Sequence, residues 1–345
     1  MNPQDQFCPS CQASGKDGFI SIHSQKERRY RCKACGKSFS ERTGTAYWAL
    51  KKSESLMTVV ITLLAYGCPS AAIVAAFGLD ARTVQAWQAK AGKQSWAVHE
   101  ATIGRKQWDL VHVQADEIKV RMQGGLLWIT MALMVSTRLW LAVSFDRVRS
   151  KTMIVDCLKQ VARCALCRPM LLAVDGMNMY QTALKKAFGA KHPVGKQGRL
   201  KWVEWGNVVL TQVVKARGNQ AGNVEQVVAI GTAQQAADLR QRSKGGSAIN
   251  SSFIERFNAT IRQRLAPLAR RSRNTLKVSQ RLEAQVYLMG TVYNFCSYHQ
   301  SLTVALYITE KRKHRVPRTP AMAAALTDHR WTIEELLKFK VQAVK

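Results

Sequence analysis

Two cysteine pairs near the start of the chain most constrain what it can fold into. Cys8-Pro-Ser-Cys11 and Cys32-Lys-Ala-Cys35 are separated by twenty residues, a spacing that lets both turns direct their thiolates at one tetrahedral zinc ion. The segment 19–31 is expected to be a hairpin that brings the turns together. Because this part of the chain has few core residues, one structural Zn²⁺ is predicted to replace the core. A redox pair or unrelated free thiols remain the alternative.

The other cysteines are predicted to be structural. The chain has nine cysteines, and an odd number with four in metal-type pairs fits a reducing compartment better than a disulfide framework. Cys157, Cys164 and Cys167 lie at helical spacing among apolar neighbours, which predicts buried thiols rather than a second metal site. Cys68 and Cys296 are also expected in the core.

The charge of the chain implies an anionic partner. Lys and Arg total 52 against 22 Asp and Glu, a formal net charge of +30. Nucleic acid is the expected partner, because binding its phosphates releases condensed counterions. Apolar runs such as 126–135 are shorter than the ~20 residues that span a bilayer, and residues 1–7 lack the pattern of a signal peptide. We therefore expect a soluble, cytoplasmic and nucleoid-associated protein with no membrane contact.

A helix-turn-helix is expected after the cysteine pairs. Apolar residues recur at helical spacing over 53–92, which predicts three short helices. Gly78 as a helix stop and Asp80 as an N-cap leave a tight connection before the third helix, 81–93. This helix would present polar side chains that suit base edges in the major groove, namely Arg82, Gln85, Gln88 and Lys90. The alternative is an ordinary three-helix bundle with a solvated polar face.

From residue 107 the hydrophobic pattern changes to that of strands. Seven elements are predicted in the order β-β-β-α-β-α-β, at 110–120, 126–135, 139–145, 150–165, 170–174, 180–188 and 207–214. The short apolar run before a helix is typical of a buried parallel strand. This order predicts a ribonuclease H-like domain with a mixed five-stranded sheet. A helical pattern at 252–272, broken or bent at Pro267, and another at 282–298 follow.

The fold class expected from these patterns is multidomain α/β. The predicted layout is a zinc β-ribbon at 1–46, a helix-turn-helix DNA-binding domain at 47–98, a catalytic domain at 106–300 with an insertion at about 189–250, and a C-terminal helical tail at 301–345.

Three carboxylates are the predicted catalytic residues. Asp116 lies in the first predicted strand and Asp175 ends the fourth, and a charge there is costly to bury without a cation or a task. These strands are neighbours in a ribonuclease H-like sheet, so the two aspartates should meet, and Glu255 should arrive from a helix. Three such carboxylates hold two divalent ions, Mg²⁺ or Mn²⁺, for in-line displacement at phosphorus. The alternative for Glu255 is an ordinary ion pair on a solvated basic face.

Two other acids, Glu117 and Glu204, are not expected to belong to the catalytic site. Glu117 alternates to the opposite face of the strand from Asp116. Glu204 lies beside Trp202 and Trp205, far from any predicted sheet end; the two tryptophans either pack their own segment or stack an unpaired base.

A basic surface is predicted beside the carboxylates. Arg262 lies almost two helical turns beyond Glu255 and hence on the same face of the helix, where it can hold the phosphate of a bound strand. The basic stretch that follows would track the DNA backbone. The DNA-binding residues predicted here are Asn258, Arg262, Arg264, Arg270 and Arg271.

At these residues the chain resembles the short insertion-sequence transposases of bacteria and archaea, which have a zinc ribbon, a helix-turn-helix and an Asp-Asp-Glu core. The resemblance covers nearly the whole chain and implies that Asp116, Asp175 and Glu255 are the metal-binding triad. It also implies that Arg262 is the basic residue beyond the glutamate. The matching motifs are the two cysteine pairs, Ala115-Asp116-Glu117, Val174-Asp175-Gly176, Ile254-Glu255-Arg256-Phe257-Asn258, Tyr293-Asn294-Phe295 and Thr319-Pro320-Ala321-Met322.

The resemblance implies an enzyme that binds the terminal repeats of a mobile element and catalyses metal-dependent cleavage and strand transfer. Its partners would be double-stranded DNA, both element ends and target. Joining two ends needs at least two active sites, so a homodimer or higher oligomer on DNA is expected. Two alternatives remain open: a ribonuclease H-like nuclease or resolvase, and a domesticated DNA-binding regulator.

Overall fold

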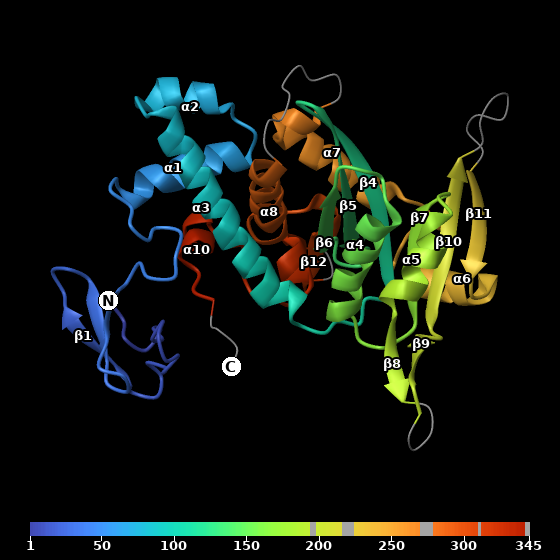
Figure 1. Cartoon of the computed structure of the whole chain (residues 1–345), viewed down its shortest axis with the longest axis horizontal. Coiled ribbons are helices and arrows are strands. Elements are labelled where there is room, and N and C mark those ends of the chain that lie inside the picture. The colour runs from blue at the N-terminus through green and yellow to red at the C-terminus, as the bar shows by residue number, and fades with distance from the viewer. Residues whose placement is uncertain (194–197, 216–223, 270–278, 310–311, 342–345) are drawn as a thin grey trace.

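The computed structural model describes residues 1–193, 198–215, 224–269, 279–309 and 312–341. Figure 1 shows a small N-terminal module at one end, a large sheet at the other, and helices between them. The module is a three-stranded antiparallel sheet of β1 (Ile20–Ser24), β2 (Arg29–Cys32) and β3 (Ser38–Ser40). The predicted hairpin is confirmed as β1 and β2.

Three helices follow, as predicted: α1 (Glu54–Ala65), α2 (Ser70–Phe77) and α3 (Ala81–His99). Gly78 ends α2 in the left-handed conformation, and the Asp80 side chain accepts a hydrogen bond from the Arg82 amide. Both predicted helix boundaries are therefore confirmed.

Helix α3 is longer than predicted and continues into a π-helical turn, Glu100–Gly104. Its second half packs against α8 (Ser279–Cys296). The two helices approach so closely at Gly92 that a Cβ there would lie 2.5 Å from the Cβ of Ala284. Tertiary packing therefore extends the helix beyond the range that its own pattern predicted.

The large sheet has six strands in the order β11-β10-β7-β4-β5-β6. They are β4 (His112–Met122), β5 (Gly125–Met134), β6 (Trp140–Asp146), β7 (Met170–Asp175), β10 (Val208–Lys215) and β11 (Val224–Ile230). β4, β7 and β10 are parallel neighbours, and the other pairs are antiparallel. The prediction of five strands was wrong, because β11 covers the open edge of β10.

Helices cover both faces of the sheet. α4 (Lys151–Cys164) and α5 (Met179–Ala187) pack on one face, and α6 (Ala233–Arg242), α7 (Ser252–Arg264) and α8 on the other. The buried strand β7 serves both layers, because Leu172 faces the first and Leu171 the second.

The remaining elements lie outside the sheet. A hairpin of β8 (Gly189–Pro193) and β9 (Leu200–Glu204) projects beyond it (Figure 1). Within the range 189–250, which was predicted as an insertion, β10 and β11 belong to the sheet itself. Residues 301–345, predicted as a helical tail, contain the hairpin β12 (Val304–Thr309) and β13 (Arg312–Val316) as well as the helices α9 (Pro320–Ala323) and α10 (Ile333–Lys338).

One buried amide covers the first residue of the edge strand β6. The Asn294 side chain accepts a hydrogen bond from the Trp140 amide and donates one to the Trp140 carbonyl, both at 2.9 Å. These bonds satisfy backbone groups of the edge strand β6 that pair with no other strand. The asparagine of the Tyr293-Asn294-Phe295 motif therefore has a structural role.

Cys157, Cys164 and Cys296 are buried, as predicted. The prediction was wrong for Cys167, which is exposed because α4 ends at Cys164 and Cys167 lies in the loop beyond it. None of the helices in the described parts of the chain is long and apolar enough to cross a membrane.

Acid is expected to destabilise the packing of α3 on the sheet through His99. Its Nε2 lies 3.1 Å from the Leu141 carbonyl, and burial lowers its pKa from 6.5 to about 4. Between those values the unfolded chain binds more protons, so stability is lost as the pH falls below 6.5. Urea unfolding should show a loss of about 2 kcal/mol from this group between neutral pH and about pH 5. The variant His99→Gln should lack that part of the pH dependence; an unchanged slope would contradict this assignment.

Candidate functional site

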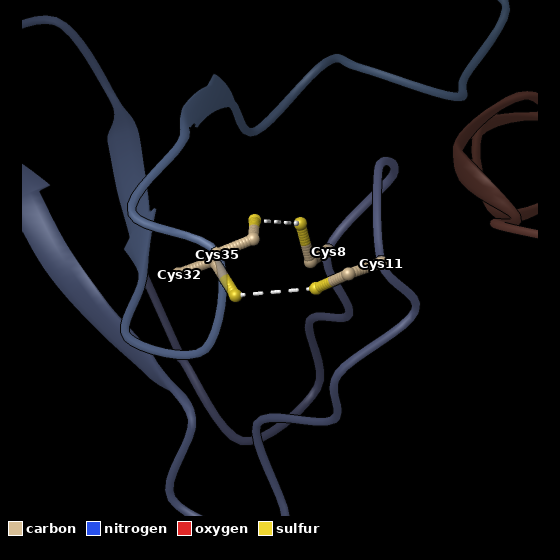
Figure 2. A group of neighbouring side chains, drawn as sticks. All are labelled: Cys8, Cys11, Cys32 and Cys35. Atoms are coloured by element: carbon tan, nitrogen blue, oxygen red, sulfur yellow. Dashed lines mark hydrogen bonds between the residues drawn. The ribbon is translucent and has the colours of Figure 1, made fainter.

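Four cysteine sulfurs meet in the N-terminal module (Figure 2). The Sγ atoms of Cys8 and Cys35 lie 3.6 Å apart, as do those of Cys11 and Cys32, and all four lie within 4.8 Å of one another. A tetrahedral zinc ion with Zn–S bonds of about 2.3 Å places its sulfurs about 3.8 Å apart. The cluster can therefore hold one metal ion, and its donor set and spacing fit Zn²⁺.

The thiols of Cys8 and Cys11 differ in pKa. Burial alone would raise the pKa of Cys8, but hydrogen bonds from the Cys11 and Ser10 amides lower it to about 7. The Ala13 amide acts to lower the pKa of Cys11, yet burial and the other three thiols raise it to about 12. Adjacent thiolates repel one another, and a bound cation removes that repulsion.

The sheet brings two of the predicted catalytic acids together. Strand β4 pairs with β7 in parallel, with Gln114 opposite Ala173. Two residues further along each strand stand Asp116 and Asp175. Each offers a carboxylate oxygen within 4.8 Å of the other. The predicted juxtaposition of these two aspartates is confirmed.

The structure adds Glu117 to this cluster, against the argument from strand alternation. A Glu117 oxygen lies within 4.8 Å of oxygens of both Asp116 and Asp175. Glu117 does face the α4 and α5 side, where the Tyr180 hydroxyl donates a hydrogen bond to it. However, β7 ends at Asp175, so beyond this point no strand separates the two faces of β4 on that side. Alternation fixes the direction of a side chain and leaves open how far its carboxylate reaches.

Arg149 is the counter-ion of the cluster in this structure. Its Nη2 donates to Glu117 at 2.5 Å and to Asp175 at 3.3 Å. The guanidinium also lies over the Trp128 ring, 5.2 Å from its centroid. Arg149 immediately precedes Ser150, the N-cap of α4, so the helix start fixes where the guanidinium stands. Neither Arg149 nor Tyr180 carries a sequence pattern that marks it.

The carboxylates are incompletely neutralised. Burial raises the pKa of Asp116, to which the charges of Asp175 and Glu255 add. Burial also raises the pKa of Glu117, although Tyr180 and Arg149 act to lower it. Buried carboxylates with an excess of negative charge favour a cation, and an all-oxygen donor set fits Mg²⁺ or Mn²⁺. The cluster of Asp116, Glu117 and Asp175 could therefore bind a metal ion.

Glu255 lies in the first turn of α7 and is exposed, with its Oε1 accepting a hydrogen bond from the Ser251 hydroxyl at 2.8 Å. It is outside the group of acids whose oxygens lie within 4.8 Å of one another, as far as the described residues extend. It acts on Asp116 through its charge, which contributes to the raised pKa of that carboxyl.

A glutamine ties α7 to the strand that carries Asp116. The side-chain oxygen of Gln114 accepts hydrogen bonds from the Phe253 and Ile254 amides, both at 3.0 Å, and its amide donates to the Asn250 carbonyl. Gln114 is fully buried and supplies the start of α7 with the cap that its own Ser251 side chain does not give. It is thus a positioning residue for the helix that bears Glu255.

Replacing Gln114 by Ala should destabilise the chain by about 2–4 kcal/mol, because buried backbone groups lose their partners and a cavity forms. Urea denaturation measures this loss. The matched control is Gln263→Ala, an exposed glutamine of the same helix, with an expected change within about 0.5 kcal/mol. Equal stabilities of the two variants would show that the contact is dispensable.

The predicted DNA contacts on α7 have different surroundings. Asn258 is fully buried, and its Nδ2 donates to Asp116 Oδ2 at 2.8 Å; it orients the carboxylate in this structure. The Arg264 guanidinium lies over the Tyr66 ring, 4.6 Å from its centroid, and burial lowers its pKa. Arg262 is half-buried on the same helix. Arg270 and Arg271 lie outside the described residues.

The predicted base-reading residues of α3 divide into two pairs. Arg82 and Gln85, at the start of the helix, are exposed. Gln88 accepts a hydrogen bond from the Gln285 amide at 3.1 Å, and Lys90 donates to the Trp48 carbonyl at 2.7 Å. The first pair is open to a partner, while the second takes part in intramolecular packing.

The hairpin residues that were weighed as alternatives lie apart from the acidic cluster. Glu204 is exposed in β9. Trp202 packs against Gly189 and donates to the Lys185 carbonyl, and Trp205 packs on Phe188 with ring centroids 5.4 Å apart. The two tryptophans thus anchor the hairpin to the end of α5.

In comparisons with known proteins, no family model matches the chain and no curated protein matches it.

Proposed function

We propose that the chain is a DNA transposase that binds the ends of a mobile element and catalyses metal-dependent strand cleavage and strand transfer. The observation that carries this proposal is the pairing of Asp116 with Asp175 on adjacent parallel strands, beneath a helix that bears Glu255. The strand order β6-β5-β4-β7-β10 is the order expected of a ribonuclease H-like sheet. The resemblance in sequence motifs assigns the same three acids.

In this proposal the carboxylates hold divalent metal, which when bound supplies a nucleophile and stabilises the leaving oxygen at phosphorus. Asn258 fixes the orientation of the Asp116 carboxylate through its hydrogen bond. Gln114 sets where α7 begins and hence where Glu255 stands. Arg149 balances the charge of Glu117 and Asp175.

Two residues are candidates for the third metal-binding acid, Glu255 and Glu117. Sequence motifs favour Glu255, whereas proximity favours Glu117. We propose Glu255 as the ligand, because its side chain is exposed and can turn towards a metal ion held by the two aspartates. Glu117, by contrast, is 8% exposed and engaged by Tyr180 and Arg149. In this assignment Glu117 holds Arg149 beside Asp175.

The charge and the N-terminal elements support DNA as the partner. A net charge of +30 suits a polyanion. Arg82 and Gln85 stand exposed at the start of α3, the part of a recognition helix that contacts base edges. The four-cysteine cluster would hold a structural Zn²⁺ in a module that assists end binding. A dimer or higher oligomer on DNA remains part of this proposal, because two ends must be joined.

The test is incubation of the purified protein with a supercoiled plasmid that carries the element's own ends, with Mg²⁺ or with EDTA. Cleavage or joining at the ends that requires metal supports the proposal. Cutting without preference for the ends would instead identify a nuclease or resolvase. End binding without strand breakage in Mg²⁺ or Mn²⁺ would identify a DNA-binding regulator.

A further inference from the structure

A basic pocket of about 440 Å³ lies beside α7, between the turn that precedes β6 and the residues that follow α8. Among the described residues that line it there are four basic side chains and no acidic one: Arg138, Arg256, Arg264 and His299. Ser252 and Thr260 add hydroxyl groups from the same helix. None of the catalytic acids lines this pocket, so it is a second site on the helix that carries Glu255.

Arg138 is the side chain in the pocket that most needs a partner. Its Nε and Nη1 are buried and have no hydrogen-bond partner in the described part of the chain. The guanidinium stacks on the Phe253 ring, 3.8 Å from the centroid. Its backbone has φ 59°, a conformation that non-glycine residues seldom adopt. Unpaired donors on a half-buried charge are costly, so this arrangement is suited to an anion.

The neighbours of Arg138 favour the same ligand. Burial lowers the pKa of Arg138, and Arg256 adds to this effect by repulsion. Burial lowers the pKa of His299 as well, with Arg138 and Arg256 contributing. The basic groups are therefore close enough to repel one another. A multiply charged anion with several acceptor oxygens would offset that repulsion.

We propose that this pocket binds one phosphate group of a DNA strand, with Arg138 as its main ligand. The assignment to DNA rests on the proposed function, whereas the anion chemistry rests on the pocket alone. Arg138 lines the pocket with a charged guanidinium, and Arg256 and Arg264 add two further cations that can bind phosphate oxygens. Because α7 also bears Glu255, a phosphate held here fixes the bound strand relative to the acidic cluster.

The test measures binding of a labelled duplex carrying the element end, by fluorescence anisotropy over a range of salt concentrations and in EDTA. Arg138→Gln should weaken binding about tenfold and lower the slope of log affinity against log salt by about one. Arg256→Gln, at an exposed position of α7, should act in the same direction and does not endanger folding. The matched control Arg105→Gln, exposed and away from the pocket, should leave affinity and slope nearly unchanged.

Equal affinity and slope for wild type, Arg138→Gln and Arg256→Gln would overturn the proposal. A second arm follows thermal unfolding in inorganic phosphate and in chloride at equal ionic strength. If phosphate stabilises the wild type and not Arg138→Gln while DNA binding is unchanged, the ligand is a soluble phosphate and the assignment to DNA is wrong. Binding is measured in EDTA, where no catalysis occurs. A failure of strand transfer in the separate assay with Mg²⁺ would therefore refute the proposed function and leave the binding result unchanged.

Discussion

Asp175→Asn should lower the rate of metal-dependent strand breakage at the element ends by about a thousandfold or more. The substitution removes a carboxylate charge that supports a divalent ion, and such an ion contributes several kcal/mol of transition-state stabilisation, with each ~1.4 kcal/mol equal to a tenfold change in rate. Asp116→Asn should behave alike, since the two residues stand on paired strands with oxygens within 4.8 Å. Single-turnover cleavage of the end-bearing plasmid measures both rates.

The folded state should survive this substitution. Asn has the shape of Asp, and losing one of several adjacent negative charges relieves repulsion. The thermal midpoint of Asp175→Asn in EDTA should therefore equal or exceed that of the wild type. If the Asp175→Asn protein is folded and stable in EDTA but cleaves DNA at the wild-type rate, the assignment of the site is wrong.

The same assay separates Glu255 from Glu117. Glu255→Gln should reduce cleavage as strongly as Asp175→Asn while leaving stability unchanged, because Glu255 is exposed. Glu117→Gln keeps a group that can accept from Tyr180 but weakens the hold on Arg149, so a smaller loss of activity is expected. The reverse ranking would make Glu117 the third metal ligand and reduce Glu255 to a surface acid.

Cys8→Ser should unfold the N-terminal module. Cys8 is fully buried, and the module has only a small core of Ile20, Tyr30 and Phe39 beside its cysteines. Binding of structural zinc contributes on the order of 10 kcal/mol in small zinc modules, which so small a core does not replace. Zinc content measured by atomic absorption should fall from one ion per chain towards zero. Limited proteolysis should then remove residues 1–46 and leave the helices and the sheet intact.

The matched control is Cys167→Ser, which changes an exposed cysteine outside the cluster. This variant should keep its zinc and its resistance to protease. If Cys8→Ser also retained one zinc ion and the wild-type digestion pattern, the four sulfurs would not form a structural metal site.

The order of secondary structure was predictable because it depends on local pattern. The alternating and continuous apolar runs predicted β4, β5, β6, β7 and β10 close to their observed bounds. Gly78 and Asp80 marked a helix end and a helix start through backbone conformation and capping, which are properties of a few adjacent residues. β11 was missed although residues 227–230 form an apolar run, because so short a run does not by itself distinguish a strand from other structure and its pairing with β10 defines it.

The spacing of the cysteines and the placement of acids in apolar runs were enough to predict the four-cysteine cluster and two of the three acids of the acidic cluster. The sequence shows the reason for each: the cysteine module has too few apolar residues for a large core, and the aspartates place charge in buried strands. Asp116 and Asp175 could be paired because neighbouring parallel strands bring corresponding positions together.

Only the tertiary structure decided what surrounds those acids. Glu117 joins the cluster because β7 stops at Asp175, and Arg149 reaches it from a loop more than thirty residues along the chain. Gln114 caps a helix that begins at Ser252, over a hundred residues away. The sequence determined which residues carry charge and where each strand and helix runs. Packing of distant segments determined how far each carboxylate reaches and which groups neutralise it, because the distances and burial that set those interactions exist only in the folded chain.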